Sequence, residues 1–586
     1  MRLIEIRLLE GPNVYRLEPV VKVEVAIGRR RTWYGQRVPP RHLLVRLAAP
    51  VPARLWPDDV AALVAWAKRL RADHGEEAGP LQVHRSSDPG HWIVEWPWRG
   101  AERARLIAEA ALALTERDVS PRKRVQLTGA QQRMLTRWTS RIDEARTTPP
   151  AWLRDADRKI PVVSITGTNG KSTVTRLITH IFMCAAWHVG TTTSDGVLVD
   201  ERMVEPGDWT GPGGAAQILG RSDIGLAVLE TARGGMMLRG VGYESNDVSV
   251  LTNVSSDHLD LQGIHTLPEL AEVKATVCRM TKTGGWVVLN GDDPFVWAVS
   301  RTVRGHVAAF SMKGPRGTAA KRALANGGRA YVVHRGQLTE LEGDKSRAIV
   351  PVAEVPITIA GLATHNVANA LAAAGAARGL GATLAQVGDG LRDFKPSSER
   401  SPGRLNLFKL GSRIVIVDFA HNEAGIAAIL DVAEGIAGGA AGRAAKITAI
   451  IGTAGDRPDD TLRGIGRIAG QRAQRIAIKE TPKYLRGRTR ESVVGELLAG
   501  VRAAGRSTND VPIYPTETEA LRSELTGAGA SAAGQGKPDA PRVIVLMCHE
   551  EREEVFKLLA SLGARPVDVG TELTELVPRL QKQGRR

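Results

Sequence analysis

The sequence is poor in cysteine and has no long apolar run. Its 586 residues include three cysteines, Cys184, Cys278 and Cys548, which are far apart and form no Cys-x-x-Cys pair. This usage favours a reducing cytoplasm and argues against a structural zinc site. No apolar run reaches the length of a membrane span, and the N-terminus MRLIEIRLLEGPN lacks the apolar core of a secretory signal. We therefore expect a cytoplasmic protein that does not contact a membrane.

A dense block of basic residues is also missing, although the net charge is +16. The arginines are scattered, and no Lys/Arg block has the interleaved aromatic residues that would follow a nucleic-acid strand. Nucleic acid is therefore not an expected partner. The positive charge is compatible with anionic ligands such as nucleotides or acidic peptides, as a secondary effect.

The chain is too long for one hydrophobic core, and its composition is that of ordinary globular proteins. We place three domains at 1–127, 159–398 and 399–586, and a linker at 128–158. The polar stretch at the start of this linker ends at Pro149-Pro150. In the first part, short alternating runs at Val20–Ile27 and Trp92–Trp96 predict strands. Helical spacing of apolar residues at 58–72 and 101–116 predicts two helices, so this part is a small α+β domain.

The remaining parts show apolar runs of strand length alternating with helical stretches, a pattern typical of a parallel sheet covered by helices. The overall prediction is an α/β fold, with a central P-loop parallel-sheet ATPase domain and a C-terminal Rossmann-like α/β domain. The predicted strands of the two domains are Pro161–Ile165, Ile224–Leu229, Val248–Thr252, Trp286–Asn290, Ile414–Val417, Ile447–Ile451, Arg475–Ile478 and Val543–Met547. Residues 526–541 are of low complexity and predict a surface loop.

One short stretch carries the clearest chemistry. The sequence GTNGKST follows a predicted strand and precedes a predicted helix at Ser172–Cys184, which is the setting of a phosphate-binding loop. Glycines let the backbone N–H groups turn toward phosphate oxygens, the lysine reaches the β- and γ-phosphates, and the next serine can bind Mg²⁺. The glycine spacing is shorter than in GxxxxGK[ST], so this is a variant loop. The expected ATP-binding residues are Gly167, Thr168, Asn169, Gly170, Lys171, Ser172 and Thr173.

The loop and the motifs downstream resemble the Mur ligase superfamily, whose members join a carboxylate to an amine at the expense of ATP. Glu230 ends an apolar strand in LAVLETARGG, where Mg²⁺ would need a hard oxygen ligand. His258 in TNVSSDHLD matches the family's magnesium-binding histidine, and Lys274 in ELAEVKATV matches its carbamylated lysine. The resemblance therefore implies two Mg²⁺ ions held by Ser172, Glu230, His258 and Lys274, with Lys171, His258 and Lys274 also counted as catalytic.

Further motifs follow in the family's order. GLATHNVANALAA resembles the segment that contacts the adenine, which implies nucleotide-binding roles for Asn366 and Asn369. SPGRLNLF implies a phosphate contact by Arg404, and VDFAHNEAG implies that Asp418 contacts the ribose. GTAGDRPDD contains Asp456 and Arg457, which are then expected among the catalytic residues, where the amine substrate enters.

Within the superfamily, the sequence looks most like the Mur-ligase-like part of cyanophycin synthetase. The segments TTTSDGV, GDWTGPGGA and ETARGGMMLRG carry this resemblance, and LLEGPNVYRL resembles the opening of that enzyme's N-terminal domain. The ATP-grasp domain that lies between these two parts in cyanophycin synthetase is missing here. The implied activity is an ATP-dependent carboxylate–amine ligase, forming ADP, that couples an amino acid or other amine to a cyanophycin-like or acidic peptide substrate through an acyl phosphate.

Two alternatives stay open: a Mur ligase acting on a peptidoglycan or folyl precursor, and a non-catalytic nucleotide-binding partner of an ATP-grasp ligase. The expected partners are ATP, a carboxylate acceptor that is an acidic peptide or amino-acid derivative, an amine donor and a second copy of the chain. His549, Glu550 and Glu551 in CHEEREE are interpreted as an acidic, solvated helix start rather than a metal site.

Overall fold

The structure, a computed structural model, describes residues 1–27, 49–116, 128–256, 259, 261–397, 401–439, 445–526 and 542–567. It divides into two compact units, each of which is described by itself. The first unit comprises Met1–Gly167, Trp187–Val254 and Leu259–Val307. The second comprises Thr168–Ala186, Ser255–His258 and Ala308–Arg586. The predicted low-complexity loop lies outside the described residues except for Thr526, the last residue of a helix.

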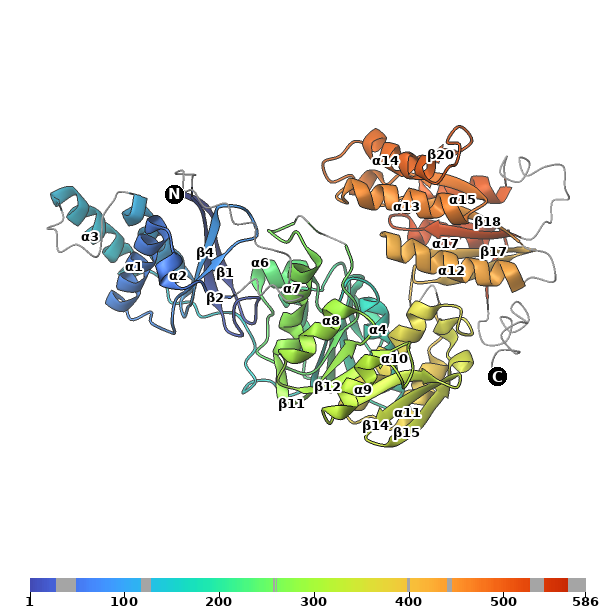
Figure 1. Cartoon of the computed structure of the whole chain (residues 1–586), viewed down its shortest axis with the longest axis horizontal. Helices are drawn as coiled ribbons and strands as arrows, with labels where there is room; N and C mark the ends of the chain where they lie inside the picture. The colour runs from blue at the N-terminus through green and yellow to red at the C-terminus, as the bar shows by residue number, and fades with distance from the viewer. Residues whose placement is uncertain are drawn as a thin grey trace. The chain divides into compact units, whose positions relative to one another are not determined.

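The N-terminal region, residues 1–145, combines an antiparallel sheet with helices (Figure 1). The strands, in the order β1-β2-β4-β3, are β1 Arg2–Leu9, β2 Val20–Ala26, β3 Gln82–Arg85 and β4 His91–Pro97. The helices are α1 Asp58–Asp73, α2 Ala101–Glu116 and α3 Gly129–Glu144. Apolar side chains from β2, β4 and all three helices form one core, in which Trp66 and Trp96 are almost fully buried. Helix α3 lies within the predicted polar linker, yet its Leu135 and Ile142 are buried in this same core.

The rest of the first unit is built on seven strands in the order β11-β10-β5-β9-β6-β7-β8. Strands β5, β6, β9, β10 and β11 pair in parallel, whereas β7 and β8 add an antiparallel edge. The strands are β5 Val162–Thr166, β6 Val189–Thr192, β7 Gly196–Val199, β8 Arg202–Pro206, β9 Leu226–Glu230, β10 Asn246–Leu251 and β11 Thr281–Asn290. The helices are α5 Pro212–Leu219, α6 Arg233–Arg239, α7 Leu267–Arg279 and α8 Pro294–Ala298.

The second unit contains α4 Lys171–Cys184 and a mixed set of strands, β12 to β15. The parallel-sheet prediction does not extend to these strands, because β13 pairs antiparallel with β14, and β14 pairs antiparallel with β15. The loop between β13 and β14 consists of Arg335 and Gly336, both with positive φ, as a tight hairpin requires. The elements are β12 His306–Ser311, β13 Arg329–His334, β14 Gln337–Glu342, β15 Lys345–Pro351, α9 Thr318–Ala325, α10 Thr364–Gly379 and α11 Leu384–Asp393.

The C-terminal part of the second unit is a seven-stranded sheet in the order β20-β19-β18-β21-β17-β16-β22, parallel except at β16 and β22. Alternate residues of each strand face opposite layers: Val543 and Val545 pack with α12, α13 and α14, whereas Ile544 and Leu546 pack with α15 and α17. The strands are β16 Asn406–Leu410, β17 Arg413–Asp418, β18 Lys446–Ile451, β19 Arg475–Lys479, β20 Ile513–Tyr514, β21 Arg542–Met547 and β22 Arg565–Pro566. The helices are α12 Glu423–Gly439, α13 Asp459–Arg472, α14 Arg490–Ala503, α15 Glu517–Thr526 and α17 Arg552–Ser561. The α/β class with parallel sheets is thus confirmed.

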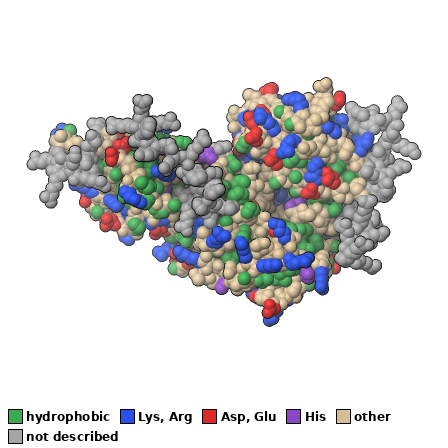
Figure 2. Space-filling model, viewed as in Figure 1, with side chains coloured by type: hydrophobic (Ala, Val, Ile, Leu, Met, Phe, Trp, Pro, Cys, Tyr) green, Lys and Arg blue, Asp and Glu red, His purple; other side chains and the backbone are tan. Residues whose placement is uncertain are grey.

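The surface agrees with the scattered charge of the sequence. On the face drawn in Figure 2, Lys and Arg side chains are spread over the described parts with Asp and Glu among them. Among the described helices, none is both long enough and apolar enough to cross a lipid bilayer.

Candidate functional site

Three parallel strand ends meet at the start of the phosphate loop. Strand β5 lies between β9 and β10, and Glu230 at the end of β9 is in register with Ile165. The backbone N–H of Thr231 donates to Ile165 O (2.8 Å), and that of Thr252 donates to Thr166 O (3.0 Å). The carboxyl ends of parallel strands are the edge where α/β proteins bind ligands. The structure therefore places Glu230, which is 3% exposed, at this edge. Its pairing partner on β5, Ile165, lies two residues before Gly167 in the chain.

The backbone of the loop requires both of its glycines. Gly167 has φ +151°, and a Cβ atom there would lie 1.8 Å from Thr252 Oγ1. Gly170 has φ +84°, and a Cβ atom there would lie 2.4 Å from Asn369 Oδ1. Helix α4 begins directly after Gly170, at Lys171, so its first N–H groups have no partner within the helix and can bind an anion. The predicted strand–loop–helix arrangement is confirmed.

Two lysine side chains bond to carbonyl groups of this loop. In the second unit, Lys171 Nζ donates to Thr168 O (2.9 Å). In the first unit, Lys274 Nζ, from the middle of α7, donates to Gly167 O (2.7 Å). Lys274 is only 4% exposed, so this bond gives a buried ammonium group a polar partner. The structure thus brings Lys274 to the first residue of the loop, whereas its carbamylation stays a prediction.

Two residues of the C-terminal motifs also reach the loop within the second unit. Arg404 Nη2 donates to Ser172 Oγ (3.4 Å), and Asn422 Nδ2 donates to Asn169 Oδ1 (3.0 Å). Asp418 lies behind this contact, where its Oδ2 accepts the N–H of Leu405 (2.7 Å). Burial raises the pKa of the Asp418 carboxyl, against the lowering effects of Arg404 and of backbone N–H donors. Asp418 therefore fixes the turn after Arg404, and its contact with a ribose stays a prediction.

The ring of Phe419 makes cation–π contacts with two arginines, of which only Arg404 was predicted from the sequence as a site residue. The guanidinium carbon of Arg404 lies 4.8 Å from the ring centroid and that of Arg552 lies 5.7 Å away. Cation–π contacts of this kind hold a guanidinium group in place while leaving its N–H donors available for an anion. Arg552 begins α17 in CHEEREE, and its proximity to Arg404 could not be seen from the sequence.

Asn366 and Asn369 occupy the first turns of α10 and bond to each other. Asn366 Oδ1 accepts from Asn369 Nδ2 (3.0 Å), and Asn366 Nδ2 donates to Ile357 O (3.0 Å). Asn369 is also the residue against which Gly170 packs, so this pair adjoins the loop. Their neighbour His365 is partly exposed, and desolvation of its imidazole lowers the pKa of that ring to about 4.

Of the remaining predicted residues, Asp456 and Arg457 contact arginine side chains, and His258 lies outside the described residues. Asp456 forms an ion pair with Arg486, and among the described residues its second oxygen, which is buried, has no hydrogen-bond partner. Arg457 is 8% exposed, and its carbonyl oxygen accepts a bond from Arg488. His258 lies outside the described residues, so its role as a magnesium ligand stays a prediction.

A buried polar network beneath the DFAHN motif was missed. The interpretation of His549 as part of a solvated helix start was wrong, because its side chain is 6% exposed and α17 begins only at Arg552. Lys479 Nζ donates to His549 Nδ1 (2.7 Å) and to Glu517 Oε1 (2.5 Å), and His549 Nε2 donates to Ala420 O (2.8 Å). The signal available in the sequence was the position of His549 just beyond the carboxyl end of an apolar strand. The network fixes the turn that carries Asn422.

This network predicts a loss of stability in acid. Burial alone would raise the pKa of Glu517, but Lys479 and backbone N–H donors lower it from its ordinary 4.5 to about 2. A carboxyl whose pKa is lowered by folding stabilises the folded state above its unfolded pKa, and the stabilisation is lost as the pH falls. We expect the free energy of unfolding to fall by about 3 kcal/mol on this account between about pH 5 and pH 2. Urea unfolding across this pH range measures it.

The matched variant is Glu517→Gln, which leaves the buried Lys479 without its carboxylate. Removing one partner of a buried ion pair costs about 3–5 kcal/mol, so we expect lower stability at neutral pH and a shallower dependence on acid. The double variant Lys479→Met with Glu517→Leu is expected to be more stable than the single variant, because no unpaired charge remains buried. An unchanged acid profile in Glu517→Gln would contradict the assigned pKa.

Comparison with known sequences identifies the central part of the chain. Residues 165–377 match the Mur ligase middle domain family. A cyanophycin synthetase from Crocosphaera subtropica is 39% identical over 374 residues, which are 63% of this chain and 41% of that protein. A UDP-N-acetylmuramoyl-L-alanyl-D-glutamate–2,6-diaminopimelate ligase from Alkalilimnicola ehrlichii is 29% identical over 397 residues, 65% of this chain and 72% of that protein. The matched part of this chain thus spans about two fifths of the cyanophycin synthetase.

Solved structures give weaker similarity. MurF from Acinetobacter baumannii matches 69% of this chain and 76% of its own, with 17% identity and a TM-score of 0.46. The family match covers the loop from Gly167 to Thr173, Glu230 and Lys274, and it does not depend on that comparison. The chain therefore contains a Mur ligase middle domain at residues 165–377, and its resemblance to the Mur ligase superfamily is confirmed.

Proposed function

We propose that this protein is an ATP-dependent ligase that activates a substrate carboxylate as an acyl phosphate and couples it to an amine. The amine is an amino acid, and the carboxylate belongs to a cyanophycin-like or acidic peptide. The observation that carries the proposal is the contact of the buried Lys274 amine with the carbonyl of Gly167, at the edge where Glu230 ends its strand. This contact supports the proposal that Lys274 acts at the first residue of an ATP-binding loop, with Glu230 at the neighbouring strand end as the acid.

The donor set fits Mg²⁺ and a nucleotide. Glu230 supplies a buried carboxylate at the strand edge and Ser172 a buried hydroxyl at the start of α4, both hard oxygen donors of the kind that Mg²⁺ prefers. We assign two Mg²⁺ to Ser172, Glu230, His258 and carbamylated Lys274, where the ions would neutralise phosphate charge. Arg404, Asn366, Asn369 and Asp418 are assigned to the nucleotide, together with the loop from Gly167 to Thr173.

The chemistry proceeds in two balanced steps. A carboxylate oxygen of the substrate attacks the γ-phosphorus of ATP, and the bond between that phosphorus and the β–γ bridging oxygen breaks, which leaves ADP and an acyl phosphate. Lys171 stabilises the charge on the phosphoryl oxygens during this transfer. The amine then attacks the acyl carbon, inorganic phosphate leaves and one proton is released. Asp456 and Arg457 are assigned to the amine side of the site.

A substrate matrix tests this proposal. Purified protein with Mg-ATP is incubated with amino acids as amines and short acidic peptides as carboxylates, and each well is scored for ADP and for the mass of a new amide. We expect ADP and amide to appear together, in equal amounts, only when both substrates are present. ADP formation without any amide in every well would contradict the ligase proposal.

Two other functions are separable by the same matrix. Similarity to the diaminopimelate ligase, which is 29% identical over 72% of that protein, favours a peptidoglycan-type acceptor as the second candidate. Including UDP-N-acetylmuramoyl peptides and folates among the carboxylates decides between the acceptors. A nucleotide-binding partner of an ATP-grasp ligase would bind ATP and release no phosphate with any pair of substrates.

The three-domain layout with bounds at 1–127, 159–398 and 399–586 and a linker at 128–158 remains part of the proposal. A cytoplasmic location and a homo-oligomeric state are also part of the proposal. Light scattering of the purified chain measures the oligomeric state directly.

A further inference from the structure

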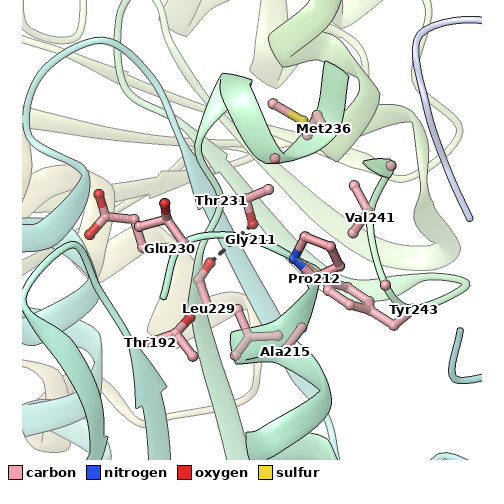
Figure 3. A pocket seen from close by; sticks show the side chains of 14 residues that line it. Thr192, Gly211, Pro212, Ala215, Leu229, Glu230, Thr231, Met236, Val241 and Tyr243 are labelled. Atoms are coloured by element: carbon pink, nitrogen blue, oxygen red, sulfur yellow. Dashed lines mark hydrogen bonds between the residues drawn. The ribbon is translucent and has the colours of Figure 1, made fainter. Parts of the chain in front are cut away.

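Two cavities of the protein differ sharply in size. The one beside Glu230, drawn in Figure 3, has a volume of about 10 Å³, which is room for about one water molecule. The other lies in the C-terminal part of the second unit and has a volume of about 350 Å³, in the range of pockets that bind small molecules. We call it the basic pocket, because four of the residues that line it are Lys446, Arg475, Arg506 and Arg542.

The basic pocket lies at the amino edge of the C-terminal sheet. Lys446, Arg475 and Arg542 are the first residues of β18, β19 and β21, which pair in parallel. Lys446 is in register with Arg542. Arg475 is in register with Thr448, which comes two residues after Lys446. Because side chains alternate between the two faces of a sheet, all three basic side chains belong to the face that α15 and α17 cover.

The opposite edge of the same sheet carries residues assigned to the ligase reaction. Asp418 is the last residue of β17, and Asp456 follows the carboxyl end of β18. Strand β18 runs from Lys446 to Ile451, a rise of about 16 Å. The basic pocket is therefore separate from the groups assigned to ATP and to the amine.

The positive charge of the basic pocket is only partly compensated. Glu524 on α15 is 1% exposed and accepts two hydrogen bonds from Arg475 (2.7 and 2.9 Å), so it neutralises that arginine. Arg506 Nη2 donates to Gln474 O (2.7 Å), which is a neutral partner. Asp510 is the one acid among the lining residues, and within the described chain it forms no ion pair. An excess of positive charge therefore faces the cavity.

Arg542 lies among other positive charges. It is in register with Arg413, the first residue of β17, so four adjacent strands begin with a basic residue on one face. Burial lowers the pKa of the Arg542 guanidinium, and the charges of Arg413 and Arg475 lower it further, against the raising effect of Glu524. A bound anion would offset this repulsion, because a nearby opposite charge favours the charged form.

Two polar groups that line the basic pocket have no partner among the described residues. Thr448 is 3% exposed, and its hydroxyl makes no hydrogen bond within the described chain. The ammonium group of Lys446, which is exposed, likewise makes no hydrogen bond or ion pair there. Buried polar groups are nearly always hydrogen-bonded, so a hydroxyl left open toward a basic cavity points to a ligand with acceptor oxygens.

We propose that the basic pocket is a binding site for a small molecule that carries two or more phosphate or carboxylate groups. Adjacent strands are about 4.8 Å apart, so the basic side chains of β19, β18 and β21 are spread over about 10 Å. One small anion does not span that distance, whereas a molecule with several oxyanion groups does. Arginine binds either oxyanion through paired N–H donors, and lysine binds it as a point charge.

Calorimetric titration of the full-length protein tests the proposal, with inorganic triphosphate and citrate as the probes. Lys446→Gln removes a charge from the pocket without breaking a bond to a described residue, and Lys557→Gln removes an exposed charge of α17 that does not line it. We expect at least one probe to bind wild type and Lys557→Gln equally well. Lys446→Gln should weaken that binding about tenfold. The probe that binds more tightly shows whether the site prefers phosphate or carboxylate groups.

Hydrogen exchange locates the bound probe, because triphosphate can also enter the ATP loop. Residues 506–511 include four that line the pocket, and their amides should exchange more slowly with the probe present, less so in Lys446→Gln. Protection confined to residues 167–173, or equal affinities of the two lysine variants for both probes, would overturn the proposal. Neither measurement needs ligase turnover, so the outcome is independent of the proposed function.

Discussion

Lys171→Ala will abolish ligase turnover, with a loss of about 10³-fold or more. The lysine starts α4 directly after Gly170, and its amine lies on the carbonyl of Thr168 within the loop. In the proposed reaction this amine stabilises the charge that gathers on the transferring phosphoryl group, for which no neutral side chain can substitute. Amide formation followed by mass spectrometry, under saturating ATP and both substrates, measures the loss.

The control for this prediction is Lys321→Ala, which removes one positive charge from the exposed face of α9 in the same unit. Its turnover should equal that of wild type, which separates a local effect from a general effect of charge. Lys171→Arg is expected to recover little, because a planar guanidinium does not replace a compact ammonium inside a tight loop. Turnover of Lys171→Ala within tenfold of wild type would refute the assignment of this loop to the reacting phosphate.

Lys274→Ala will lower turnover severely, by about 10²- to 10³-fold, and short carboxylic acids will restore part of it. If Lys274 carries a carbamate that holds a Mg²⁺ ion, its loss removes an anionic ligand and leaves a cavity beside Gly167. Acetate or propionate can enter that cavity and supply the missing carboxylate oxygens. The measurement is the rate of amide formation against added acetate and added Mg²⁺.

Lys274→Met separates the loss of the carbamate from the opening of a cavity. Methionine fills nearly the same volume but cannot form a carbamate, so its turnover should be low and should not respond to acetate. Incorporation of labelled CO₂, followed by carbon NMR, should give a carbamate signal in wild type that both variants lack. Normal turnover in Lys274→Ala would contradict the proposal of a second metal ion. Low turnover in Lys274→Ala, together with no carbamate signal in wild type, would instead assign a role to the free amine of Lys274.

Much of the fold follows from local periodicity. The helical spacing at 101–116 predicts the bounds of α2 as observed, and the apolar runs locate β5, β9, β10 and β17 to within two residues at each end. Strand β1 was not predicted, because its charged residues alternate irregularly with apolar ones. The antiparallel hairpins of β13 to β15 were also missed, although Arg335-Gly336 and Gly343 are turn residues of the kind that such hairpins require.

The candidate site likewise contains residues that could be placed from the sequence and residues that could not. Residues on one strand end, one loop and the helix after it could be placed from the sequence, because consecutive elements fix them. Lys274 was found only through its resemblance to a family motif, since nothing local distinguishes it from an exposed helix lysine. Lys479, Glu517 and His549 meet only after three separate elements have packed, and the contact of Gly11 with Val241 joins segments more than two hundred residues apart. Such long-range contacts have no periodic signal.

The order of strands in the C-terminal sheet has a consequence for how the protein is made. Strand β21 lies between β17 and β18, yet it follows both of them, and also β19 and β20, in the chain. During synthesis on the ribosome, β17 and β18 therefore each keep an unpaired edge until residue 547 has been added. Unpaired strand edges can pair with other nascent chains. Because His549, just beyond β21, bonds to the carbonyl of Ala420, the turn that carries Asn422 is completed at the same late moment. Chains released early should need chaperones and should not retain partial activity.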